Sequence, residues 1–156
     1  MEFRELMAVL AEKTGVKDEI EIDDENRCLM EFDGMGVVIQ GVDEAGVVNF
    51  LSALGEPPPE QLTGFYRALL EANHLFQGTF GATLSVAPGS GAVFLCKSIP
   101  YVALDGDKFM KDLSNFVNAV ETWRTFVSDF RATDNESVEV SGGGESSNLG
   151  GLFMRV

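Results

Sequence analysis

The sequence has few of the residue types on which catalysis, metal binding and nucleic-acid recognition depend. It contains one histidine, His74, and two cysteines, Cys28 and Cys96, which show neither metal-ligand spacing nor a C-x-x-C pattern. Its 11 lysines and arginines stand against 25 aspartates and glutamates, a formal net charge of −14. A charge of this sign repels nucleic-acid phosphates and anionic membranes. We therefore predict no nucleic-acid partner and expect any partner bound by charge to be basic.

Long apolar runs are missing as well. No run approaches the ~20 residues that a membrane-spanning helix needs, so we predict no membrane insertion. The first residues, Met1-Glu2-Phe3-Arg4-Glu5, are charged and helical rather than typical of a signal peptide. Cys28 and Cys96 each lie in an apolar, strand-like run and are interpreted as reduced core residues. These features predict a cytoplasmic protein.

Recognisable catalytic and cofactor motifs are also absent. Gly34-Met35-Gly36 lacks the third glycine of a dinucleotide-binding loop, and Ser90 joins two strands rather than a strand and a helix. His74 has no evident nucleophile to activate. A calcium loop beginning at Asp105 would place Phe116 where a glutamate is required. We predict no catalytic residues, no metal ligands and no cofactor.

The residues that are present are sufficient for one domain with its own core, since 45% of the 156 residues are hydrophobic. Apolar residues at helical spacing predict a first helix over residues 2–14, which Gly15 ends. Period-two alternation then predicts three strands, over residues 19–23, 27–32 and 37–42.

Residues 47–54 fit two patterns. Asp43 suits the cap of a short helix, but the pair Val47-Val48 and the length of the run favour a strand. Prolines 57–59 then suit the first turn of a second helix, whose apolar stripe runs from Leu62 to Leu70.

That second helix ends near His74, and two strands follow over residues 79–87 and 92–98. The last helix begins at Asp105 or Asp107 and ends near Arg131. The order of helix, three or four strands, helix, two strands and helix predicts an α+β fold with an antiparallel sheet packed against helices.

The composition changes after the last helix. Residues 1–132 are predicted to form the domain, and residues 133–156 a flexible acidic tail that contains Ser141-Gly142-Gly143-Gly144. The tail has a short apolar end, from Leu149 to Val156. One hypothesis is that this end reaches the protein's own binding groove and competes with a guest.

Several local sequences together resemble the class I type III secretion chaperones, also called the CesT-like or Tir chaperone family. They are Leu69-Leu70-Glu71-Ala72-Asn73, Gly78-Thr79-Phe80-Gly81-Ala82-Thr83-Leu84, the edge Ile99-Pro100-Tyr101 and an aromatic stripe from Phe116 to Trp123. The resemblance covers about residues 1–132 and implies a homodimer in the bacterial cytoplasm. It implies that the dimer binds an extended N-terminal segment of a secreted virulence effector. The effector would stay soluble without ATP hydrolysis by the chaperone, ready for the secretion ATPase.

Faces assigned from the periodicity give two candidate sets of binding residues, and ordinary core packing stays open as an alternative for every member. Candidates for effector binding are Phe3, Leu6, Leu10, Leu29, Val38 and Phe50. Candidates for the dimer interface are Leu62, Phe65, Leu69, Phe80 and Leu84.

Two other functions stay open at this point. The first is an acidic inhibitor or adaptor that binds a basic partner by charge, a mode that about 0.5 M salt would abolish. The second is a small enzyme with an unrecognised pair of carboxylates, which would show buried acids with perturbed pKa values in a cleft.

Overall fold

The computed structural model describes residues 2–16 and 20–139, and for residues 132–139 it describes the helical backbone alone. The helices are α1 (Phe3–Thr14), α2 (Leu62–Asn73) and α3 (Gly106–Glu139). The strands are β1 (Arg27–Phe32), β2 (Met35–Val42), β3 (Val47–Gly55), β4 (Thr83–Val86) and β5 (Val93–Pro100). They form one antiparallel sheet in the order β1-β2-β3-β5-β4, which confirms the predicted α+β class.

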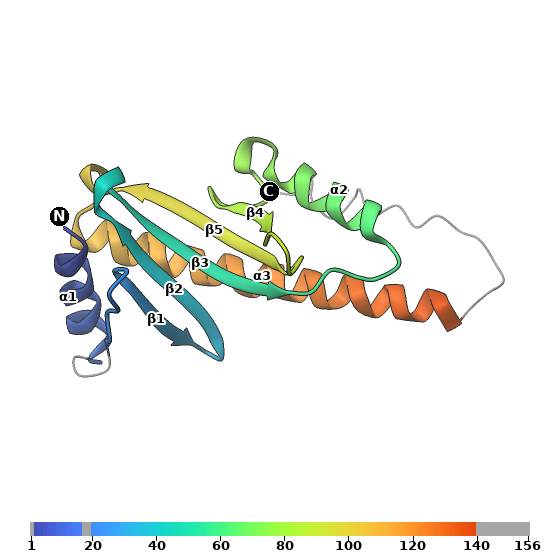
Figure 1. The fold of residues 1–156 in the computed structure, drawn as a ribbon, viewed down its shortest axis with the longest axis horizontal. Coiled ribbons are helices and arrows are strands. Elements are labelled where there is room, and N and C mark those ends of the chain that lie inside the picture. The colour runs from blue at the N-terminus through green and yellow to red at the C-terminus, as the bar shows by residue number, and fades with distance from the viewer. Residues whose placement is uncertain (1, 17–19, 140–156) are drawn as a thin grey trace.

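The helices cover one face of this sheet. The long helix α3 lies along it, with α1 near the start of α3 and α2 beside β4 (Figure 1). The ring of Phe50 on β3 packs against Phe109 and Phe116 of α3, with centroids 5.9 and 5.5 Å apart. Phe65 of α2 packs against Phe130 of α3 at 5.2 Å. Within the described residues, no helix covers the opposite face, which we call the open face.

The first helix is fixed at both ends and held close to the sheet. A reciprocal capping box joins Glu2 and Glu5 at its start, and Gly15 ends it with a left-handed φ of 79°. The ring of Phe3 lies directly over Gly41 of β2. A Cβ atom at position 41 would lie 2.5 Å from Cγ of Phe3, so this position requires glycine.

Two predicted strands differ from the structure. Residues 20–22 form no strand, although Ile20 and Ile22 pack against the core, and residue 19 lies outside the described residues. The chain turns back at Asp23, whose backbone N–H donates to the Arg27 carbonyl, so the segment before it has no strand to pair with. The strand predicted over 79–87 is confirmed for Thr83–Val86, since residues 79–81 form a turn instead.

Other boundaries are closer to the prediction. Residues 47–54 form a strand, as the Val47-Val48 pair favours. Of the two predicted starts of the last helix, Asp105 precedes α3, and its Oδ1 accepts a hydrogen bond from the Lys108 backbone N–H. The last helix continues to Glu139 rather than ending near Arg131. The glycine-rich tail and its apolar end fall in residues 140–156, outside the described residues.

The two cysteines have different surroundings. Cys28 is buried beneath the helices, and this burial raises the pKa of its thiol, as expected of a core residue. Cys96 is half-buried on the open face, so its prediction as a core residue is wrong. The alternation of β5 explains the difference, because Leu95 and Lys97 point to the helices and Cys96 points away.

Candidate functional site

The open face carries an apolar row that crosses β1, β2, β3 and β5 and meets Thr83 on the edge strand β4. The strand registers pair Leu29 with Val38, Val38 with Leu51, Leu51 with Cys96, and Cys96 with Thr83. These side chains line a hollow of about 640 Å³. Since successive residues of a strand point to opposite faces, the neighbours of these residues along each strand point to the helices instead.

A polar row runs beside the apolar one and lines the same hollow. It consists of Arg27, Gln40, Asn49 and Ser98, again paired by the registers of β1, β2, β3 and β5. Gln40 and Asn49 are half-buried and directly opposite each other. The hollow therefore combines an apolar side with a hydrogen-bonding side.

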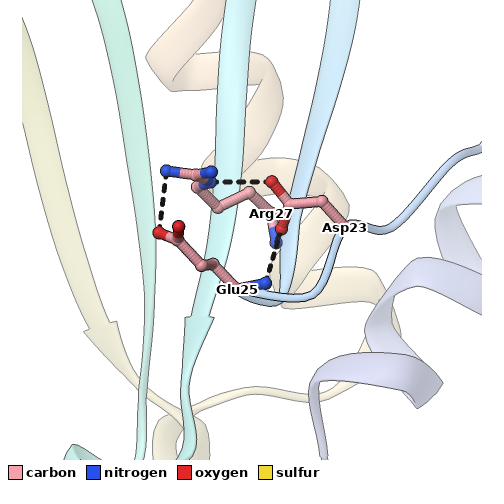
Figure 2. Close-up of polar contacts among 3 residues, drawn as sticks. All are labelled: Asp23, Glu25 and Arg27. Atoms are coloured by element: carbon pink, nitrogen blue, oxygen red, sulfur yellow. Dashed lines mark hydrogen bonds and ion pairs between the residues drawn. The ribbon is translucent and has the colours of Figure 1, made fainter.

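Arg27, at the edge of the hollow, is held by two carboxylates from the turn that precedes β1. Figure 2 shows its guanidinium between Asp23 and Glu25, at 2.8 and 2.9 Å. Oδ1 of Asp23 also accepts hydrogen bonds from the backbone N–H groups of Glu25 and Arg27. The backbone and guanidinium hydrogen bonds from Arg27 keep the pKa of the Asp23 carboxyl below its ordinary value. The edge of the hollow thus carries two carboxylates around one guanidinium rather than a free cation.

The two edges of the sheet differ. At β4, the side chain of Asn73 pairs with the backbone of Leu84, accepting from its N–H at 2.9 Å and donating to its carbonyl at 3.0 Å. At the other edge, β1 pairs only with β2 among the described residues. An edge strand of this kind can accept an added strand through backbone hydrogen bonds.

A second apolar surface lies over α2, the turn after it and β4, and we call it the α2 patch. Its large exposed side chains are Leu62, Leu70, Leu75, Phe76, Phe80 and Val86. Leu75, Phe76 and Phe80 have positive φ values of 54–55°, which bulky residues rarely adopt. The turn is fixed to α3 by Trp123, whose Nε1 donates to the Gly78 carbonyl at 3.1 Å.

The predicted effector-binding residues divide between surface and core. Leu29 is 70% exposed and Val38 is half-buried, and both line the hollow of the open face. The side chains of Phe3, Leu6, Leu10 and Phe50 are at most 2% exposed and pack in the core under the helices. In the protomer these four therefore offer no surface to a partner.

The predicted dimer residues divide in the same way. Leu62 and Phe80, at 38% and 65% exposure, belong to the α2 patch. Phe65, Leu69 and Leu84 are buried in the core. The prediction that Phe80 shares a strand face with Leu84 is wrong, because Phe80 lies in the turn before β4.

Sequence reasoning missed Leu70, Leu51 and the pair Gln40 and Asn49. A signal for Leu70 existed, since the helical stripe was too wide for both Leu69 and Leu70 to face the core. Gln40 and Asn49 become neighbours only once the register of β2 and β3 is known.

The described residues hold no group of three histidine, cysteine, aspartate or glutamate side chains that could bind a metal ion. No helix among them is both long and apolar enough to cross a bilayer.

Solved structures share this fold, while none of the curated proteins matches the chain. A chain in the ExsC–ExsE complex superposes with a TM-score of 0.67 at 20% identity, covering 81% of this chain and 97% of that one. A chain in the Yersinia pestis complex of the type III secretion chaperone SycH with a fragment of YscM2 gives 0.62 at 14%, covering 78% and 98%. A chain in the Pseudomonas aeruginosa ExoU–SpcU heterodimer gives 0.55 at 18%, covering 80% and 93%.

At these identities the structural likeness shows the fold alone. The family model of the Tir chaperone protein (CesT) family matches residues 5–124, which is most of the chain, and the protein therefore belongs to that family.

Proposed function

We propose that this protein is a type III secretion chaperone that binds an extended N-terminal segment of a secreted effector and keeps it soluble without hydrolysing ATP. The observation that carries the proposal is apolar surface left uncovered in a strongly charged chain, on the open face and on the α2 patch. Exposed apolar surface of this kind marks protein-binding sites. The net charge of −14 keeps such a protein soluble.

The comparisons support the same proposal. The chain belongs to a chaperone family, not to a family of enzymes. The solved structures that share its fold include one described as a type III secretion chaperone bound to a fragment of another protein. By this analogy we expect the protein to act in the bacterial cytoplasm and to pass its guest to the secretion ATPase.

The α2 patch supports a homodimer. Two copies related by a twofold axis would bring the same apolar side chains together, since such an interface pairs one surface with itself. Leu62, Leu70 and Phe80 would then lose their contact with water. The β1 edge lies at the opposite side of the sheet from β4 and α2 and would stay accessible to a guest (Figure 1).

Co-expression tests the proposed function. The full chain is produced with each neighbouring open reading frame in turn, and the soluble fraction is analysed for a secreted protein that is insoluble when produced alone. We expect one such protein to co-purify through its N-terminal segment. If every neighbouring secreted protein is equally soluble with and without the chain, the proposal is wrong.

Salt distinguishes this function from the acidic inhibitor or adaptor. Attraction between exposed charges is screened over a few ångströms at about 0.5 M salt, whereas apolar contacts persist. The complex obtained by co-expression should therefore survive 0.5 M salt. Dissociation at that concentration would favour binding of a basic partner by charge.

A further inference from the structure

The charges at the hollow of the open face lie at its β1 side, where Asp23 and Arg27 line it. None of the side chains that β2, β3 and β5 direct to this face is charged, although 23% of the residues of the chain are. Lys97, on β5, points to the opposite face and pairs there with Asp112. A solvent-exposed face of an antiparallel sheet is usually polar. The absence of charged side chains on three adjacent strands of this face, in a chain of net charge −14, indicates a surface that an uncharged ligand covers.

Two carboxamides lie side by side at the centre of this face. Gln40 and Asn49 lie opposite each other in the β2–β3 register and are half-buried. Within the part of the chain that the structure describes, neither side chain makes a hydrogen bond to another residue. Each carboxamide has two N–H donors and one carbonyl acceptor. The pair thus presents donors and acceptors together beside the apolar row of Leu29, Val38 and Leu51.

The chemistry of this pair matches the backbone of an extended peptide. An extended segment has free N–H and C=O groups, whereas a helix uses most of its own internally. A second copy of this chain would fit poorly, because a twofold contact of this face would place one hollow against another. The hollow therefore suits a narrow segment of another protein.

Building on the proposed function, we propose that the open face binds an extended, uncharged apolar segment of the guest. Gln40 and Asn49 hydrogen-bond its backbone, while Leu29, Val38 and Leu51 contact its side chains. Backbone amides are the same in every sequence. This arrangement therefore selects guests by extension and lack of charge rather than by a particular sequence motif.

A defined probe tests this inference without knowledge of the guest. A phage library of random 12-residue peptides is selected against the full chain, and one selected peptide is synthesised with a fluorescent label. A second version carries N-methyl groups on alternate backbone amides, which removes hydrogen-bond donors. We expect the selected peptides to be poor in charged residues and the N-methylated version to bind at least ~10-fold more weakly, the effect of one or two lost hydrogen bonds.

The matching protein variant is Gln40→Ala/Asn49→Ala. Its affinity for the unmodified peptide should be at least ~10-fold lower than that of the wild type. Its affinity for the N-methylated peptide should be no lower than that of the wild type, because the variant and the N-methylation remove the same hydrogen bonds. Since neither side chain forms a hydrogen bond with another described residue, the melting temperature should not change. The control is Asn115→Ala/Asn118→Ala, which removes two exposed carboxamides from α3 and should leave the affinity unchanged.

Leu51→Asp, which places a charge in the hollow, should abolish binding of the same peptide. The inference is wrong if no peptide is enriched, if the enriched peptides are basic, or if Gln40→Ala/Asn49→Ala binds them as the wild type does. Wild-type affinity of this variant for a co-purified secreted guest would overturn this inference alone. Peptide binding at the open face with no secreted guest found by co-expression would overturn the proposed function instead.

Discussion

Nζ of Lys97 on β5 lies 3.2 Å from Oδ1 of Asp112 on α3, and this pair ties the sheet to its longest helix. Nζ of Lys108, one helical turn before Asp112, contacts its second oxygen at 2.6 Å. Burial by itself would raise the pKa of the Asp112 carboxyl, but the hydrogen bonds from Lys108 and Lys97 outweigh it and lower the pKa below its ordinary value. The carboxylate is therefore ionised at neutral pH and holds two cations.

The first prediction concerns this carboxylate. Asp112→Asn removes the charge that both lysines use and should lower the free energy of unfolding at pH 7 by about 2 kcal/mol. Because folding lowers the pKa of Asp112, its contribution is fully present above the ordinary aspartate value of 3.8 and is lost as the pH falls below that value. The difference between wild type and variant should thus shrink between pH 7 and pH 3, measured by urea denaturation.

The control for this prediction is Asp107→Asn. Asp107 forms an ion pair with Lys13 at 3.4 Å, but its side chain is 92% exposed. Exposed pairs contribute less than about 1 kcal/mol, so this variant should unfold nearly as the wild type does at both pH values. An Asp112→Asn variant as stable as wild type at pH 7 would contradict the assigned role.

The second prediction concerns Asn73, which closes the edge of the sheet at β4. Asn73→Ala leaves the backbone N–H and carbonyl of Leu84 without their partner. The free energy of unfolding should fall by about 2 kcal/mol, the value of two hydrogen bonds. Hydrogen exchange of the Leu84 amide should become faster, while Asn115→Ala, a change at an exposed position, should affect neither measurement. Unchanged protection of Leu84 would show that Asn73 does not close this edge.

Local periodicity was enough to predict most of the fold. Residues 27–32 alternate between two faces with period two, which predicts a strand. The apolar stripe from Phe109 to Val127 repeats at helical spacing, which predicts a helix. Asn73 belongs to the run from Leu69 to Asn73, which carries part of the family resemblance. Its role depends on Leu84, which the sequence alone does not place beside it.

What could not be predicted depends on contacts between distant residues. Residues 79–81 alternate like a strand, but a hydrogen bond from Trp123 to the Gly78 carbonyl fixes the segment as a turn. Periodicity also shows which residues share a face, but not whether another element covers that face. Phe50 was therefore predicted to line a groove and Leu51 was not, whereas α3 covers Phe50 and Leu51 lines the hollow of the open face.

The third prediction concerns the close approach of α1 to the sheet. Gly41→Ala places a methyl group against the ring of Phe3 and should lower the free energy of unfolding by about 1–3 kcal/mol. Replacing Phe3 by leucine in the same chain should recover part of this loss, as measured by urea denaturation. Gly36→Ala is the matched control on the same strand, since its Cβ would meet only Cδ1 of Leu29 at 3.6 Å. Equal stability of the two alanine variants would contradict this account of α1 packing.

The fourth prediction concerns the proposed self-association through the α2 patch. Light scattering coupled to gel filtration should give twice the chain mass of 16.9 kDa for the wild type. Leu70→Asp/Phe80→Asp buries two charges at the proposed interface and should give a single chain mass, because an unpaired buried charge costs several kcal/mol. The control is Leu29→Asp, which changes an equally exposed leucine on the open face and should leave the dimer intact. A monomeric wild type, or a Leu70→Asp/Phe80→Asp variant that stays dimeric, would show that the α2 patch does not pair two copies of this chain.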